Sequence, residues 1–333
     1  MSTPKIATWL HSLPRTPEAV RATVQRLADA GVDLLIPCVK QTDGLVDYPS
    51  VVANVRPEYQ GWDALMIAAE EANRRGLAIH AWCCDFVEGT GSRLLAEHPE
   101  CRAVQHGRAT EGWSWACPRR PETQEYLLAI YRELIDRYPV QGVHLDYVRY
   151  ADGFCYCDAC RESYQRETGR DLLTRGFDTW QQPDAHDMDA WIAWRCAPVT
   201  AFVRAARAAA AAGGKALSAA VFPYLPGQLQ DVGQDWEGWL AEGLLDDIMP
   251  MTYSMSTRIA AEWTRNHRAA VAAMKGQCRL WEGLVRHRSW SAERFLRHVQ
   301  TVAAQGVDGI CIFDEPNVTD ADLAGLGALG TTA

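Results

Sequence analysis

Short apolar runs alternate with amphipathic stretches along the whole chain. Eight of the runs have the length and composition of buried strands, and the stretches between them repeat apolar residues with a helical period. Eight strand–helix units in 333 residues predict an α/β fold, a single (β/α)8 TIM barrel that spans residues 1–333 as one domain. No GxGxxG follows the first run, which argues against a dinucleotide-binding sheet. The predicted strands are Ile6–Leu10, Asp33–Cys38, Ala78–Cys83, Val143–Asp146, Ala216–Val221, Asp247–Met251, Arg279–Trp281 and Gly309–Phe313. The clearest predicted helices are Pro17–Asp29, Asp63–Arg74, Pro121–Arg137, Ile259–Met274 and Ala292–Ala304.

Two stretches interrupt the alternation. Gln41–Tyr59 is a long polar loop after the second strand, and residues 151–189 form a longer insertion with several cysteines after the fourth. Long loops at the catalytic face of a barrel usually shape a cleft. We therefore expect the insertion to lie at that face.

The fourth predicted strand ends in an unusual group of polar side chains. Gly142–Tyr150 reads GVHLDYVRY, so an apolar strand leads directly into Asp146, Arg149 and Tyr150. Packing does not require these residues, whereas barrel enzymes carry their chemistry at the C-terminal ends of the strands. The alternative is a salt bridge between Asp146 and Arg149 at the strand end.

Further acidic residues follow other predicted strands. Glu282 comes after the seventh strand, and Asp314 and Glu315 come after the eighth. Glycoside hydrolysis uses two carboxyl groups on either side of the scissile bond. Because the fourth and seventh strands face each other across a small barrel, we predict Asp146 and Glu282 as the catalytic pair.

Each of these acidic residues also has a structural interpretation. Glu282 could form a salt bridge at the rim with Arg286 or Arg288. Asp314 could be a helix N-cap or a turn residue before Pro316.

Aromatic residues are frequent, with 13 tryptophans in the chain. Aromatic faces pack against the C–H faces of sugars, although a single tryptophan is more often a core residue. We therefore predict that aromatic and polar residues at the strand ends bind a carbohydrate substrate. These predicted residues are Trp9, His11, Trp82, Arg149, Tyr150, Tyr253, Trp281, Asp314 and Glu315.

Three of the 11 cysteines lie close together in the insertion, with the spacing C-x-C-x2-C. Cys155, Cys157 and Cys160 could fill three corners of a zinc tetrahedron, with Cys117 or Cys101 as the fourth ligand. Such a zinc would be structural and would stabilise the insertion, so no cofactor is expected for catalysis. The alternative is three free cysteines.

The net charge and the N-terminal sequence argue against nucleic-acid binding, secretion and membrane insertion. The net charge of −9 argues against binding to nucleic acid. The first residues lack a signal-peptide pattern, and no apolar run reaches the roughly 18 residues of a membrane-spanning helix. We therefore expect a cytoplasmic protein that does not contact the membrane; a homo-oligomer is an open alternative.

The motifs around the fourth strand resemble those of a known family. The stretch 142–150, the preceding 115–121 with Cys117, the cysteine cluster and residues 247–253 look like the bacterial glycosyl-hydrolase-like group described as family-10-like. The segments 62–65 and 76–82 are also similar. Together these motifs cover most of the chain, and they imply a TIM-barrel glycosidase.

The cysteine spacing also resembles that of glycoside hydrolase family 42 β-galactosidases. In that family a similar cluster and an upstream cysteine hold zinc, and Cys117 is the corresponding residue that we predict here. The resemblance implies that Asp146 stands for the acid/base glutamate, Glu282 for the nucleophile and Tyr253 for the tyrosine that orients it. Asp146 is shorter than the family's glutamate, and the Asn-Glu pair is missing. Amylase-like barrels instead have a nucleophilic Asp at the end of strand four, so the two roles stay open.

These observations lead to three functional hypotheses. The first is a glycosidase that cleaves an O-glycosidic bond of an oligosaccharide or glycoconjugate with a carboxylate pair. The second is a non-catalytic carbohydrate-binding barrel that lacks such a pair. The third, a metal-dependent hydrolase, would need more histidines at the strand ends than His11 and His80 provide.

Overall fold

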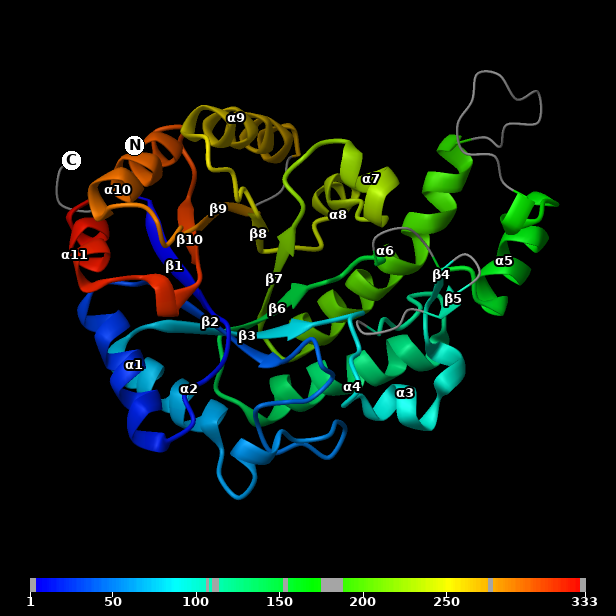
Figure 1. Cartoon of the computed structure of the whole chain (residues 1–333), viewed down its shortest axis with the longest axis horizontal. Helices are drawn as coiled ribbons and strands as arrows, with labels where there is room; N and C mark the ends of the chain where they lie inside the picture. Colours follow the sequence, from blue (N-terminus) through cyan, green and yellow to red (C-terminus); the bar gives the residue numbers. More distant parts are fainter. Residues whose placement is uncertain are drawn as a thin grey trace.

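The computed structural model describes residues 4–105, 108–109, 114–151, 155–174, 188–274 and 278–329. Its centre is a closed barrel of eight parallel strands, in which each strand pairs with its neighbours in the chain order and β1 pairs with β10 (Figure 1). The predicted TIM barrel is confirmed. The barrel strands are β1 (Lys5–Leu10), β2 (Leu34–Lys40), β3 (Ala78–Cys84), β6 (Gly142–Asp146), β7 (Ala216–Val221), β8 (Asp247–Pro250), β9 (Arg279–Val285) and β10 (Gly309–Phe313).

All eight predicted strands overlap observed ones, and the largest difference is at β9. This strand was predicted to end at Trp281, but it continues to Val285. The longer β9 places Glu282 in the middle of a strand instead of at its C-terminal end. The position of this residue is therefore different from the one that the sequence suggested.

Helices surround the barrel. Several begin at a side chain that caps the first turn: Thr16 accepts a hydrogen bond from the Ala19 N–H, and Asp63 accepts one from the Met66 N–H. The five predicted helices are confirmed to within about two residues of their ends. The helices are α1 (Pro17–Asp29), α2 (Ala64–Arg75), α3 (Arg93–Glu97), α4 (Pro121–Arg137), α5 (Asp158–Thr168), α6 (Met188–Ala212), α7 (Gly227–Val232), α8 (Trp236–Ala241), α9 (Thr257–Ala273), α10 (Ala292–Ala303) and α11 (Asp320–Leu329).

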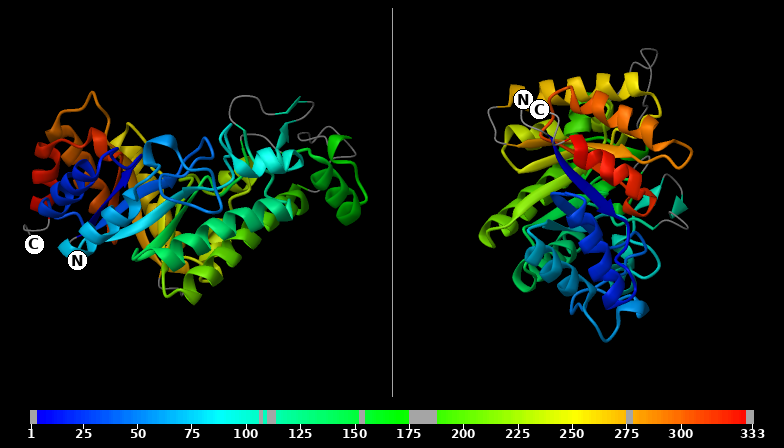
Figure 2. Two further views of the ribbon diagram at one scale, coloured as in Figure 1. Left: turned by 90° about the horizontal axis from the view of Figure 1, so that it is seen from below. Right: turned by 90° about the vertical axis from the view of Figure 1, so that its left-hand side faces the viewer.

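Two connections extend away from the barrel along the longest axis of the molecule. The connection between β3 and α4 contains α3 and a small hairpin of β4 (Val104–Gln105) and β5 (Arg108–Ala109). The connection after β6 contains α5, which lies beside this hairpin (Figures 1 and 2). The Tyr156 N–H donates a hydrogen bond to the Val104 carbonyl and joins the two connections. Residues 152–154 and 175–187 of the predicted insertion lie outside the described residues.

The apolar core is almost continuous. One large cluster of buried residues includes side chains from the barrel strands and the surrounding helices, such as Val20, Leu35 and Ile310. No helix in the described part of the chain combines the length and the apolar character that crossing a membrane requires.

Candidate active site

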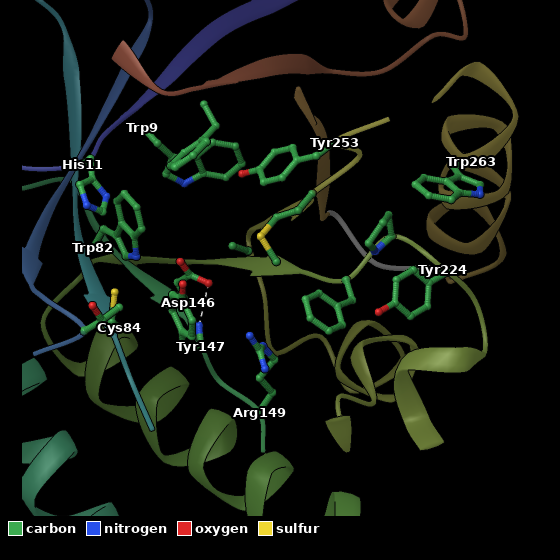
Figure 3. A pocket seen from close by; sticks show the side chains of 16 residues that line it. Trp9, His11, Trp82, Cys84, Asp146, Tyr147, Arg149, Tyr224, Tyr253 and Trp263 are labelled. Atoms are coloured by element: carbon green, nitrogen blue, oxygen red, sulfur yellow. Dashed lines mark hydrogen bonds between the residues drawn. The ribbon is translucent and has the colours of Figure 1, made fainter. Parts of the chain in front are cut away.

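A pocket of about 440 Å³ opens at the C-terminal ends of the barrel strands (Figure 3). It lies where the TIM-barrel prediction placed the chemistry. Most of its walls are aromatic or otherwise apolar, and Asp146 is the one carboxylate among the described residues that line it. The lining residues are Trp9, His11, Thr42, Trp82, Cys84, Asp146, Tyr147, Arg149, Ala220, Phe222, Pro223, Tyr224, Met251, Tyr253, Trp263 and Phe313.

Asp146 is the last residue of β6, and its side chain is directed into the pocket (Figure 3). Its exposed fraction is 7%, and one carboxylate oxygen accepts a hydrogen bond of 2.7 Å from the Tyr147 N–H. Burial raises the pKa of Asp146 to about 6, against smaller opposite effects of this hydrogen bond and of the Arg149 charge. Asp146 therefore retains a proton at mildly acidic pH, as a general acid requires.

The backbone turns sharply directly after Asp146. Tyr147 has a φ of 49° and is the only non-glycine residue in the described ranges with a positive φ. Two backbone hydrogen bonds hold this turn: the Asp85 N–H donates to the Asp146 carbonyl at 2.7 Å, and the Arg149 N–H donates to the Tyr147 carbonyl at 2.9 Å. A bulky residue adopts this conformation at an energetic cost, which is typical of functional sites.

Arg149 lies among aromatic rings at one side of the pocket. Its guanidinium carbon is 4.6 Å from the ring centre of Phe222, 5.0 Å from that of Trp115 and 5.1 Å from that of Tyr147. These cation–π contacts keep the positively charged Arg149 guanidinium beside the pocket. The Arg149 charge lowers the pKa of Asp146, but burial raises it by more.

Trp9, which lines the pocket, is held by a series of buried hydrogen bonds between residues of the barrel strands. The Trp9 indole N–H donates to Nε2 of His144 at 3.0 Å, and Nδ1 of His144 lies 2.9 Å from the Ser218 hydroxyl. The same hydroxyl lies 2.9 Å from Nδ1 of His80. Burial lowers the pKa of both histidines, that of His80 to about 4. Two neutral imidazoles therefore fix the Trp9 ring below the pocket.

Six of the predicted site residues meet in this pocket, namely Asp146, Trp9, His11, Trp82, Arg149 and Tyr253. The Tyr253 ring stacks on Phe313 with centroids 5.5 Å apart and meets Trp9 edge to face. Four further aromatic residues line the pocket that no sequence pattern predicted as site residues, namely Phe222, Tyr224, Trp263 and Phe313. Trp263 occurs within a helical pattern, and nothing in that pattern distinguishes it from a core residue.

Glu282 does not reach the pocket. It is fully buried on the outer side of β9, where its carboxylate accepts a hydrogen bond from the Thr252 hydroxyl and lies 3.0 Å from Nδ1 of His267 in α9. The next residue, Gly283, faces the barrel interior, because a side chain there would collide with Trp9. Alternate strand residues point to opposite sides, so Glu282 points away from Asp146. The structure thus separates the two members of the predicted pair, and a salt bridge with Arg286 or Arg288 is not formed either, because Glu282 pairs with His267.

Four other predicted substrate-binding residues also lie outside the pocket lining. Tyr150 is 3% exposed and packs against Arg195, and the Trp281 indole N–H donates to Asp247 below the pocket. Asp314 accepts a hydrogen bond from the Asn317 side chain, in agreement with its interpretation as a turn residue. Glu315 forms an ion pair with Arg26 of α1. Strand-end positions alone therefore did not separate the side chains that face the pocket from those that do not.

The four predicted metal ligands converge. The sulfur atoms of Cys117, Cys155, Cys157 and Cys160 all lie within 4.8 Å of one another, and all four side chains are buried. In a tetrahedral zinc site with Zn–S bonds of 2.3 Å, the sulfurs would be about 3.8 Å apart. The four thiols thus fit a metal ion. Cys101 belongs to a separate small cluster, so Cys117 is the upstream member.

The cysteine group joins the two connections that extend from the barrel. Cys117 lies between β5 and α4, and the other three lie at the start of α5. Hydrogen bonds from the three neighbouring thiols hold the pKa of Cys157 well below its usual range, so this group favours a thiolate. A metal held here would keep no open coordination position, and we assign it no step in catalysis.

A TIM barrel with a carboxylic acid at a strand end and an aromatic pocket around it is typical of glycoside hydrolases. Comparison with known families agrees with this class. Residues 5–292 match the family described as Glycosyl hydrolase-like 10. The chain belongs to this family.

Curated relatives are distant and longer. The chain is 31% identical over 101 residues to the glycosyl hydrolase DigH of Escherichia coli, which covers 27% of this chain and 23% of DigH. It is 22% identical over 261 residues to the glycosyl hydrolase YngK of Bacillus subtilis, covering 71% of this chain and 50% of YngK. The chain thus spans half the length of these relatives or less.

Solved structures share the fold. The glycoside hydrolase domain of PgaB (BpsB) from Bordetella bronchiseptica superposes with a TM-score of 0.77, at 14% identity and 99% coverage of both chains. The catalytic domain of a β-amylase from Paenibacillus polymyxa gives a TM-score of 0.68, at 11% identity and 98% coverage of both chains. At these identities the likeness establishes the barrel fold alone.

Proposed function

We propose that the protein is a glycosidase that cleaves an O-glycosidic bond with Asp146 as the general acid. The observation that carries the proposal is the buried Asp146 carboxyl at the C-terminal end of β6, in a pocket lined by aromatic side chains. Its burial raises the pKa of Asp146 to about 6, which suits a proton donor. Membership of the glycosyl hydrolase-like family supports the same reaction class. The substrate would be an oligosaccharide or a glycoconjugate.

The reaction that we propose proceeds in two steps. Asp146 gives its proton to the glycosidic oxygen while the bond from this oxygen to the anomeric carbon breaks. Water then attacks the anomeric carbon, and the Asp146 carboxylate takes up the proton that the water loses. The faces of Trp9 and Tyr253 are suited to stabilise the positive charge that develops on the sugar ring.

One observation favours a second candidate function, a carbohydrate-binding barrel without turnover. Among the described residues that line the pocket, Asp146 has no second carboxylate beside it. Most glycosidases use a pair of carboxyl groups. The aromatic walls would serve binding equally well without hydrolysis.

The test is a screen of chromogenic glycosides and oligosaccharides with the wild-type protein and the Asp146→Asn variant. We expect Asp146→Asn to lower kcat about 10²- to 10⁴-fold, because it removes the proton donor. Asp320→Asn is the matched control, since Asp320 is 89% exposed and lies at the start of α11. Hydrolysis by Asp146→Asn at a rate close to wild type would refute the glycosidase proposal. Binding of a sugar by the wild type without any turnover would favour the second function.

A further inference from the structure

The pocket has a second end that the proposed chemistry at Asp146 does not use. Figure 3 shows Tyr224 and Trp263 at the side of the pocket away from Trp82 and His11. Tyr224 follows β7, and Trp263 is part of α9. These two elements bring two aromatic side chains to the same end of one cavity.

Asp146 and Trp82 are buried, whereas Tyr224 and Trp263 are partly exposed, as is His11 beside Trp82. Trp82 and Asp146 are 4% and 7% exposed, whereas Tyr224 is 38% exposed. Ile259, one helical turn before Trp263 on α9, is 46% exposed. A ring bound beside Asp146 would therefore contact buried side chains, and Tyr224 and Trp263 are accessible to a second ring attached to it.

A single buried network holds both walls of the second end. His267 lies one helical turn after Trp263 on α9, and its Nε2 donates a hydrogen bond of 2.5 Å to the carbonyl oxygen of Pro223, next to Tyr224. Its Nδ1 lies 3.0 Å from the Glu282 carboxylate, and both of these side chains are fully buried. The segment that carries Tyr224 and the helix that carries Trp263 are thus fixed relative to each other. Preorganised walls of this kind reduce the entropy that a ligand must lose on binding.

We propose that Tyr224 and Trp263 form a second subsite, which binds the sugar ring on the leaving-group side of the bond that Asp146 protonates. The inference rests on the proposed glycosidase function. Phe222, Pro223 and Met251 line the same pocket, and the Arg149 guanidinium carbon lies 4.6 Å from the centre of the Phe222 ring, so the occupant that fits is a pyranose that presents a C–H face to the Tyr224 and Trp263 rings. Binding energy from this ring acts on the step at the neighbouring bond, as contacts remote from the reacting atoms do in enzymes.

The experiment compares two substrates of the same sugar. One is the oligosaccharide that shows Asp146-dependent cleavage in the screen, and the other is the corresponding glycosyl fluoride, which has no second ring. We expect Tyr224→Ala and Trp263→Ala to lower kcat/KM for the oligosaccharide roughly tenfold to a hundredfold, and to lower it for the fluoride at least ten times less. Tyr224→Phe keeps the ring and should stay within about threefold of the wild type on the oligosaccharide.

Trp62→Ala is the matched control for Trp263→Ala. Trp62 is half-buried, its indole N–H donates to the Glu58 carbonyl, and it does not line the pocket. Equal losses on the oligosaccharide and on the fluoride would refute the second subsite while Asp146-dependent hydrolysis still stands. If the wild type binds the sugar without cleaving it, the same variants are compared by their Kd for the disaccharide and for the monosaccharide. Equal changes in the two Kd values would again refute the subsite, and a protein that binds neither would refute the proposed function as well.

Discussion

The Nδ1 atom of His267 lies 3.0 Å from a carboxylate oxygen of Glu282, and both side chains are fully buried. The other ring nitrogen, Nε2, faces the Pro223 carbonyl oxygen, which can only accept a hydrogen bond, so Nε2 carries a hydrogen. The buried Glu282 carboxyl therefore connects β9 to the helix that carries His267. These contacts suit a positioning role for Glu282, which differs from the catalytic role expected from the sequence.

This pair predicts how Glu282→Gln behaves. The substitution disturbs the buried hydrogen bonds of Glu282 with Thr252 and His267, and we expect the free energy of unfolding to fall by about 1–3 kcal/mol. KM should rise more than kcat falls, since the Tyr224 and Trp263 walls lose their support. Urea unfolding and steady-state kinetics measure these effects. A variant of normal stability that loses about a thousandfold in kcat would show instead that Glu282 is the second catalytic carboxylate.

The raised pKa of Asp146 predicts how stability depends on pH. The pKa of an Asp is about 3.9 in the unfolded chain and about 6 here. Between these values the folded state holds a proton that the unfolded state has lost, so this group makes the free energy of unfolding fall as pH rises from about 4 to 6. Asp146→Asn removes this loss and should be more stable than the wild type at pH 7, by about 2–3 kcal/mol at most. Chemical denaturation at pH 4 and pH 7 tests this, because the variant should gain stability relative to the wild type only at the higher pH.

The same pKa predicts the pH profile of hydrolysis. As the general acid, Asp146 must be protonated, so kcat/KM should decrease about tenfold per pH unit above roughly pH 6. The measurement is a pH profile of kcat/KM for the substrate found in the screen. An activity that increases between pH 6 and 8 would contradict the role of Asp146 as a proton donor.

Local patterns in the sequence were sufficient for the fold and for part of the site. The apolar run that ends at Asp146 identified both a barrel strand and its functional end, because strand polarity alone places such residues at the mouth of a parallel barrel. The cysteine spacing identified three members of a cluster, because Cys155, Cys157 and Cys160 lie within a short segment and are therefore near one another in any fold of the chain.

Long-range pairing was not visible in the sequence. Glu282 resembles a residue at a strand end until His267 of the preceding helix is seen to pair with it. Glu315 likewise forms an ion pair with Arg26, which is 289 residues away in the sequence. Trp263 has the helical spacing of a core residue, and only the packing of α9 against the barrel brings it to the pocket. The role of each of these residues depends on the distant residue that the closed barrel places next to it.

A buried ion pair behind the pocket leads to another prediction. The Lys40 ammonium lies 2.9 Å from the Glu88 carboxylate, with both side chains inaccessible, and donates to the Cys84 carbonyl at 2.5 Å. Cys84 lines the pocket, and the following Asp85 N–H supports the backbone of Asp146. Lys40→Met leaves Glu88 unpaired and should destabilise the fold by about 3–5 kcal/mol, whereas the double variant Lys40→Met/Glu88→Met should lose less than the sum of the two single changes. Additive losses in urea unfolding would contradict coupling between the two residues.

The cysteine group predicts a metal that stabilises the fold and takes no part in the reaction. Four buried sulfurs within 4.8 Å fit one zinc ion, and we expect about one zinc per chain in protein purified under reducing conditions. Cys157→Ser should abolish stoichiometric zinc and lower the unfolding temperature, since the ion would connect Cys117, before α4, to the start of α5. Cys278→Ser is the control, because Cys278 is half-buried and does not belong to the group. Elemental analysis and thermal unfolding with and without a chelator measure both effects. Equal zinc content and equal stability in the two variants would show that the four thiols do not hold a metal.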